Sequence, residues 1–221
     1  MHNCVDKLID IQKEIQAKSN KLNYIDTKPN IIAVSKTFSI SKIMPLIEHG
    51  HIHFGENKVQ EALDKWSEVK IKYNNIQLHM LGKLQSNKVK NAIPLFDYIH
   101  SLDNIKLAEK ISSEQLKKNK KIKIFIQINI GNEPQKSGIK KEELDNFYKI
   151  CKKDLGLNVI GLMCLPPKNI SEDQFFLEML NLSKKLEISE LSMGMSSDYI
   201  TAIKYKASFL RIGTKIFGSR I

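Results

Sequence analysis

The sequence predicts an α/β protein that folds as a single (β/α)8 TIM barrel with an extra N-terminal helix. Apolar, β-branched runs alternate with amphipathic stretches along the chain, which is typical of parallel strands joined by crossover helices. Eight such runs favour a closed barrel over an open doubly wound sheet. No linker rich in Pro, Gly or Ser divides the 221 residues, so we expect one domain over residues 1–221.

The predicted elements follow one another in a regular order. Apolar spacing predicts a leading helix from near Cys4 to Ala17. The strands are predicted at Ile31–Lys36, His51–Gly55, Gln77–Gly82, Tyr98–Leu102, Lys123–Ile130, Asn158–Leu165, Glu190–Gly194 and Phe209–Gly213. Seven helical segments separate them, for example Asn57–Lys70 and Glu142–Asp154. Because little chain follows Gly213, we expect the leading helix to cover the gap between the last strand and the first.

Composition narrows the class of protein. No apolar run approaches the ~18 residues of a membrane span, and charges stand where a signal peptide has its apolar region. Three cysteines without metal-ligand spacing predict neither a disulfide framework nor a structural metal. We therefore expect a cytoplasmic protein that does not bind a membrane.

The basic residues are almost all lysines. A net charge of +11 suits polyanion binding, but the lysines are scattered without interleaved aromatic residues, so we expect no nucleic-acid partner. Of 35 basic residues only Arg211 and Arg220 are arginines. This pattern indicates a place near the C-terminus where Lys does not replace the planar guanidinium.

A lysine ends the first predicted strand. In "IIAVSKT", period-two alternation places Ile32, Val34 and Lys36 on one face. Barrel active sites lie at the carboxyl ends of the strands, so Lys36 is expected to project into the barrel mouth. Such a lysine either extends to water or is a partly buried amine of lowered pKa, as a Schiff base with an aldehyde requires.

Two loops near the C-terminus suggest a phosphate site. "LSMGMSSDYITAIKY" passes from a strand ending at Gly194 to a helix near Ser197, and in "FLRIGTKIFGSR" Thr214 follows Gly213 at the end of the last strand. Their N–H groups and the hydroxyls of Ser196 and Thr214 suit a dianionic phosphate, as after strands seven and eight of many barrels. Ser and Gly equally favour helix caps and tight turns, so the loops alone do not distinguish a phosphate site from an ordinary cap and turn.

Arg211 favours the phosphate interpretation. Alternation groups Phe209, Arg211 and Gly213 on one face, and the place of Gly213 beside the phosphate loops makes that face the inner one. A guanidinium inside a barrel needs an acceptor, either a buried carboxylate or a ring nitrogen of a cofactor. An inward Lys36, a facing Arg211 and a phosphate site together fit pyridoxal 5'-phosphate (PLP).

Other polar residues near the strand ends are open to two interpretations. Asn57 suits a helix N-cap as well as a cofactor ligand, and Glu56 suits a surface acid. His79 alternates with hydrophobic residues, which predicts a packed histidine and not a ligand. Three residues after the third strand belong either to a polar loop or to the site: Lys83, Gln85 and Asn87.

Seven linked segments carry a family resemblance. They are "VSKT", "FGENKVQEA", "LGKLQSNK", "QINIGNEPQKSG", "GLMCLPP", "LSMGMSSD" and "RIGTKIFGSR". In this order they resemble the PLP homeostasis protein family, known as YggS or PROSC, from Ile31 to Arg220. The resemblance implies a PLP-binding barrel similar to the N-terminal domain of alanine racemase. It also implies the cofactor contacts, with Lys36 as the Schiff-base lysine, Asn57 lining the cofactor, Arg211 facing the pyridine nitrogen, and Ser196, Gly213 and Thr214 at the phosphate.

The resemblance implies a PLP carrier acting in vitamin B6 homeostasis. An Arg at the pyridine nitrogen weakens the ring as an electron sink, and a racemase with such a site needs a second base. In alanine racemase that base is a tyrosine from a further domain of the partner subunit, which we do not expect in this chain. We therefore predict no catalytic residue, with a racemase-like PLP enzyme as the alternative. Expected partners are PLP and apo PLP-dependent enzymes, and the missing domain suggests a monomer.

Overall fold

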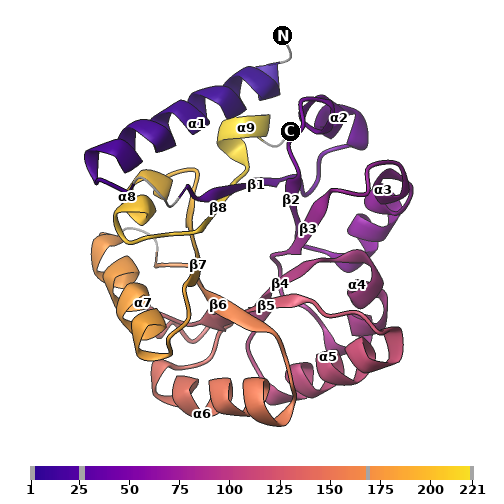
Figure 1. The fold of residues 1–221 in the computed structure, drawn as a ribbon, viewed down its shortest axis with the longest axis vertical. Coiled ribbons are helices and arrows are strands. Elements are labelled where there is room, and N and C mark those ends of the chain that lie inside the picture. Colours follow the sequence, from indigo (N-terminus) through magenta and orange to yellow (C-terminus); the bar gives the residue numbers. More distant parts are fainter. Residues whose placement is uncertain (1–2, 25–27, 168–169, 220–221) are drawn as a thin grey trace.

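The computed structural model describes residues 3–24, 28–167 and 170–219, which form a closed barrel of eight parallel strands surrounded by helices (Figure 1). Each strand pairs with the next in sequence, and β8 (Phe209–Ile212) closes on β1 (Asn30–Val34). The predicted (β/α)8 class with its leading helix is confirmed. Arg220, the second arginine noted in the sequence, lies outside the described residues.

The remaining elements alternate around the barrel. The strands are β2 (His53–Glu56), β3 (Gln77–Met80), β4 (Tyr98–Leu102), β5 (Lys123–Ile128), β6 (Val159–Cys164) and β7 (Glu190–Met195). The helices are α1 (Asn3–Lys21), α2 (Ile40–Glu48), α3 (Val59–Lys72), α4 (Val89–Leu95), α5 (Ile105–Lys118), α6 (Leu144–Lys149), α7 (Asp173–Lys185), α8 (Tyr199–Lys204) and α9 (Thr214–Phe217). Short 3-10 turns at Ser86–Lys88 and Lys141–Glu143 precede α4 and α6, and a π-helical turn at Ile150–Asp154 follows α6.

All eight predicted strands are present, but several end earlier than predicted. β1 ends at Val34 and not at Lys36, because Thr37 takes a left-handed conformation, φ +69°, that turns the chain out of the sheet. The Ser35 N–H still donates to the Gly55 carbonyl at 3.0 Å, so the turn stays attached to β2. Lys36 is therefore presented by a turn and not by a strand.

The leading helix covers the seam between the last strand and the first, as predicted. Its buried residues recur at three- and four-residue spacings, which gives α1 one apolar stripe: Val5, Leu8, Ile11 and Ile15. α1 packs against α2, α8 and α9 on the outside of β8 and β1 (Figure 1). The one-turn helix α9 was not predicted, because four residues are too few to show a helical period.

The barrel interior forms an apolar cluster distinct from the core beneath the helices. It consists of Ile32, Tyr98, Phe125, Met163 and Phe209. Phe209 and Ile32 in this cluster confirm the inner faces that alternation predicted for β8 and β1. His79 lies fully buried against Tyr98 and Phe209, so the prediction of a packed histidine is confirmed.

Two further observations concern membranes and metals. Within residues 3–24, 28–167 and 170–219, every helix is too short or too polar to cross a membrane. The same ranges hold no cluster of three or more His, Cys, Asp or Glu side chains suited to a metal ion.

The thiols of Cys151 and Cys164 are buried, and burial raises the pKa of each to about 12, so both remain protonated at neutral pH.

Candidate functional site

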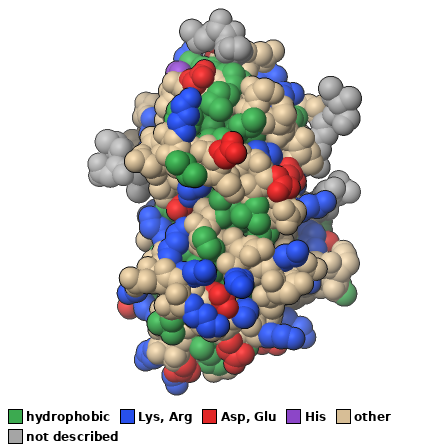
Figure 2. Space-filling model, turned by 90° about the vertical axis from the view of Figure 1, so that its right-hand side faces the viewer, with side chains coloured by type: hydrophobic (Ala, Val, Ile, Leu, Met, Phe, Trp, Pro, Cys, Tyr) green, Lys and Arg blue, Asp and Glu red, His purple; other side chains and the backbone are tan. Residues whose placement is uncertain are grey.

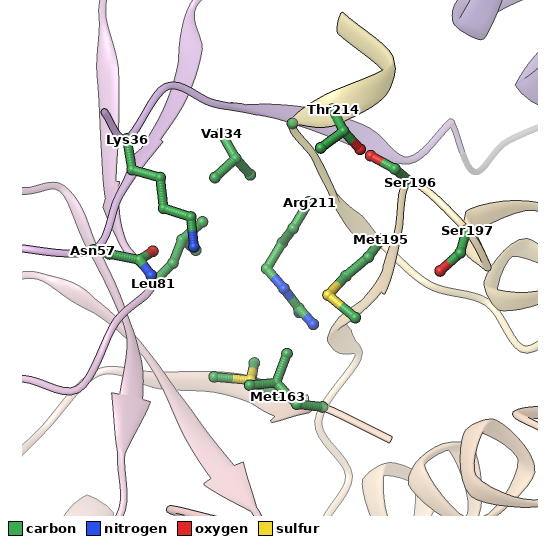
Figure 3. A pocket seen from close by; sticks show the side chains of 12 residues that line it. Val34, Lys36, Asn57, Leu81, Met163, Met195, Ser196, Ser197, Arg211 and Thr214 are labelled. Carbon is green, nitrogen blue, oxygen red and sulfur yellow. The ribbon is translucent and has the colours of Figure 1, made fainter. Parts of the chain in front are cut away.

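A cavity of about 460 Å³ opens at the carboxyl ends of the strands (Figure 3). Its size is typical of a small-molecule site. It brings together all six residues that the sequence singled out for the cofactor: Lys36, Asn57, Ser196, Arg211, Gly213 and Thr214. Of the remaining lining residues, alternation along the first strand had indicated only Val34. These residues are mainly apolar: Val34, Leu81, Met163, Leu165, Met195 and Ser197.

The turn that carries Lys36 is held by hydrogen bonds on both sides. The Ser35 hydroxyl donates to Oε1 of Glu56 at 2.8 Å, and the backbone N–H of Thr37 donates to the Glu61 carboxylate. A β-branched residue in the left-handed region is strained, so Thr37 needs such a contact to stay there. Lys36 is half-buried and its side chain extends over the pocket (Figure 3).

Glu56 is a buried anchor beneath this turn, so its interpretation as a surface acid was wrong. The side chain is completely buried, and its Oε1 also accepts from Trp66 Nε1 at 2.9 Å and Lys65 Nζ at 2.9 Å. Lys65 in turn donates to the Ser35 carbonyl at 3.0 Å. The sequence shows Glu56 at a strand end, but only the packing of α3 on β2 reveals the partners that allow a carboxylate to be buried.

Asn57 faces the pocket and does not cap α3, whose N-cap is Lys58. The end of β3 fixes its backbone closely, since a Cβ on Gly82 would lie 2.3 Å from the Asn57 carbonyl oxygen. In Figure 3 the Asn57 amide and the Lys36 side chain reach the same side of the pocket. Of the two interpretations of Asn57, the structure therefore favours site lining.

The two predicted phosphate loops lie side by side opposite Lys36. The hydroxyls of Ser196 and Thr214 point toward one another in Figure 3, and the Lys215 N–H donates to Ser196 Oγ at 3.4 Å. Gly194 allows the first loop to turn, with φ +89°, and a Cβ there would lie 2.7 Å from the Cβ of Ala202. Hydroxyls and N–H groups from two loops are thus available to an anion at this rim.

Arg211 lies at the floor of the pocket and is 5% exposed. Its Nη1 donates to the Ser192 carbonyl at 2.5 Å and the Ser192 hydroxyl at 2.7 Å, and Nη2 donates to the Cys164 carbonyl at 2.8 Å. Burial lowers the pKa of Arg211, which nevertheless stays charged because its ordinary value is so high. Arginine has five N–H donors. The N–H on Nε and the second N–H on Nη2 have no hydrogen-bond acceptor among the described residues.

These contacts bear on the two acceptors that the sequence left open for Arg211, a buried carboxylate and a ring nitrogen of a cofactor. Within the described ranges its hydrogen-bond acceptors are two carbonyls and one hydroxyl, and no carboxylate is among them. A buried cation without an ion pair favours a polar ligand that accepts its remaining N–H groups. A ring nitrogen of a ligand in the pocket is such an acceptor.

The polar residues after β3 lie outside the pocket. Lys83, Gln85 and Asn87 are exposed and do not line the cavity, so they belong to the polar loop. What the pocket offers is a lysine amine, a charged guanidinium, hydroxyls at an anion-binding rim and apolar walls. This set suits a flat, phosphorylated aromatic aldehyde.

Relatives of the chain are found in several bacteria. The family described as alanine racemase, N-terminal domain, matches residues 10–221. The chain is 36% identical over 220 residues to the pyridoxal phosphate homeostasis protein of Haemophilus influenzae, covering 95% of this chain and 93% of that protein. It is 30% identical over 233 residues to the protein of that name from Escherichia coli K12, covering 100% of this chain and 98% of that protein.

Solved structures share the same architecture. PipY of Synechococcus elongatus, solved with PLP bound, matches with a TM-score of 0.81 at 31% identity, over 92% of this chain and 100% of PipY. The alanine racemase of Clostridium difficile 630 matches with a TM-score of 0.72 at 14% identity. That match covers 99% of this chain but 57% of the racemase, and it shows the barrel fold alone.

Proposed function

Because the chain belongs to the pyridoxal phosphate homeostasis protein family, we propose that it holds PLP as a Schiff base on Lys36. Its role is to bind PLP reversibly and to limit and supply the intracellular pool of this aldehyde. The observation that carries the proposal is the convergence of Lys36, Arg211 and the two phosphate loops on one cavity. The PLP-bound structure of PipY supports it.

Each predicted residue has a distinct role in this proposal. The Lys36 amine would form the carbon–nitrogen bond to the aldehyde carbon, and the aldehyde oxygen would leave as water. Arg211 offers its remaining N–H groups to the pyridine nitrogen. Asn57 lines the ring, while the phosphate is received by the loops of Ser196, Gly213 and Thr214. The whole chain, residues 1–221, acts as one PLP-binding domain.

Carrier activity fits the pocket better than catalysis. Among the described lining residues, the side chains that ionise are those of Lys36 and Arg211. The Tyr199 hydroxyl is engaged by Glu14 and Lys215, and Tyr98 lines a pocket at the opposite end of the barrel. Racemisation at an Arg-faced ring needs a second base on the far side of the substrate Cα, so a racemase-like enzyme is the weaker candidate.

Incubation with amino acids in D2O separates a carrier from a racemase. We expect the PLP-loaded protein to leave the Cα–H and the chirality of L-amino acids unchanged, and to pass PLP to an apo PLP-dependent enzyme. Proton NMR and chiral chromatography measure the first, and recovered activity of the acceptor enzyme measures the second. Exchange or inversion that Lys36→Ala abolishes would overturn the carrier role.

The proposal also covers the partners of the chain and its place in the cell. Apo PLP-dependent enzymes are the proposed recipients of PLP, in the cytoplasm, with the chain acting as a monomer. Lys side chains are spread over the face shown in Figure 2 with Asp and Glu between them. On this face the charges are mixed and form no single basic stripe of the kind that tracks a nucleic-acid backbone, and we therefore propose no nucleic-acid partner.

Replacing Arg211 by lysine tests its place at the ring. We expect Arg211→Lys to retain the Schiff base but to shift the visible absorption band of bound PLP, because a lysine ammonium is a point charge without the planar fork. Absorption spectra of the PLP-loaded wild-type and variant proteins measure the shift. If the two spectra coincide, Arg211 does not face the ring.

A further inference from the structure

A row of hydrogen-bonded side chains crosses the barrel interior from the amino end of β2 to Arg211. We call His53, His79, His100 and Ser192 the histidine row. His53 Nδ1 lies 3.0 Å from His79 Nε2, and His79 Nδ1 lies 2.9 Å from His100 Nε2. His100 Nδ1 lies 2.8 Å from the Ser192 hydroxyl, which accepts from Arg211. The row thus links the far end of the barrel to the floor of the pocket.

The donors and acceptors of the row allow one consistent arrangement of protons. Arg211 can only donate, so Ser192 Oγ accepts from it and gives its own hydrogen to His100 Nδ1. His100 then carries its hydrogen on Nε2 and donates to His79, which likewise donates from Nε2 to His53. If the rings carried their hydrogens on Nδ1 instead, the His100 N–H would point at Ser192 Oγ, which already accepts from Arg211. The Ser192 hydroxyl hydrogen would then have no acceptor among the described residues.

This arrangement requires neutral rings, and their surroundings supply that condition. His79 and His100 are completely buried, and burial holds the pKa of each well below its ordinary value. The Arg211 charge lowers the pKa of His100 further, while burial lowers that of His53 to about 4. All three rings are therefore neutral at neutral pH, and each can accept on Nδ1 and donate from Nε2.

Stacking prevents the buried rings from turning. His79 lies against Tyr98 with ring centroids 4.1 Å apart and planes inclined by 14°, and His100 lies against Phe125 at 4.2 Å and 17°. Stacked rings in a close-packed interior keep one orientation. The lone pair of His100 is therefore held toward the Ser192 hydroxyl, whose oxygen accepts from Arg211.

We propose that the histidine row positions the Arg211 guanidinium for the cofactor ring, which makes Ser192, His100 and His79 positioning residues of a pocket that they do not line. The row supplies an oriented acceptor to a buried guanidinium without placing a carboxylate beside it. A carboxylate there would compete with the ligand for the remaining N–H groups of Arg211. This inference rests on the proposed function, because the ligand is taken to be PLP.

The proton arrangement is testable without any cofactor. Long-range ¹H–¹⁵N NMR spectra of the apo protein, labelled at histidine, distinguish the two tautomers of each ring. We expect His53, His79 and His100 as Nε2–H tautomers in the wild-type protein, and a mixture at His100 once Ser192→Ala removes its donor. Nδ1–H tautomers at His79 and His100, or a His100 tautomer that Ser192→Ala leaves unchanged, would overturn the proposal.

PLP titration then tests whether the row acts on the site. Ser192→Ala removes one acceptor from a charged donor, so we expect PLP to bind about tenfold more weakly. We also expect its visible band to shift in the same direction as in Arg211→Lys. His79→Phe keeps the stacking on Tyr98 but interrupts the row two residues from Arg211, and should give a smaller shift of the band.

Ser101→Ala is the matched control, because Ser101 is a buried β4 serine whose hydroxyl has no partner among the described residues. We expect Ser101→Ala to leave the affinity and the band of bound PLP unchanged. If folded Ser192→Ala protein also binds PLP with wild-type affinity and spectrum, the positioning role is refuted. If the wild-type protein binds no PLP, the proposed function fails instead, and the apo NMR spectrum still reports whether the row exists.

Discussion

Lys36→Ala protein is expected to take up PLP without the visible absorption band of a Schiff base and to lose the cofactor on desalting. The phosphate loops and Arg211 remain in this variant, so weak binding persists, but the covalent bond that retains the aldehyde is gone. Absorption spectra before and after desalting measure both effects.

Lys83→Ala is the matched control for this experiment. Lys83 follows β3 on the same side of the barrel, but it is exposed and does not line the pocket. We expect its spectrum and PLP retention to equal those of the wild-type protein. A visible band that survives in Lys36→Ala would show that another lysine carries the aldehyde.

Glu56→Ala is expected to destabilise the fold more than any other single change at the site. The substitution leaves Lys65, whose side chain is 9% exposed, with Glu61 as its remaining ion-pair partner, and leaves the Trp66 N–H without its acceptor. Leaving the buried Trp66 N–H without an acceptor costs ~1–3 kcal/mol of unfolding free energy, and the weakened pairing of Lys65 adds to this loss. Urea denaturation followed by circular dichroism measures the loss.

Glu68→Ala provides the comparison for Glu56→Ala. Glu68 is exposed on α3, the helix that also carries Lys65 and Trp66, and we expect its removal to change the unfolding free energy by less than about 0.5 kcal/mol. Equal losses in the two variants would mean that the cluster beneath the Lys36 turn does not stabilise the barrel.

Local patterns in the sequence were enough to predict the barrel and six residues that line the cavity at its carboxyl end. Alternation along β1 and β8 placed Ile32, Val34, Phe209 and Arg211 on inner faces, and the structure has them there. The strand ends were less predictable, because alternation does not reveal where pairing stops. For this reason Lys36 was predicted at the end of β1 but is presented by the following turn.

The misinterpreted and missed residues depend on contacts between distant segments. Glu56 resembled a surface acid because its donors Lys65 and Trp66 reach it only when α3 packs on β2. The histidine row was missed for the same reason, since barrel closure brings His100 to Ser192 from 92 residues away. Sequence patterns within one element carry no information on such contacts.

Borohydride reduction of the PLP-treated protein, followed by proteolysis and mass spectrometry, tests the central claim most directly. Hydride reduces the carbon–nitrogen double bond of a Schiff base to a stable secondary amine, so the cofactor stays on the residue that bound it. We predict a single pyridoxyl group on the peptide that contains Lys36. An unmodified protein, or a pyridoxyl group carried mainly by another lysine, would contradict the assignment of Lys36 as the PLP anchor.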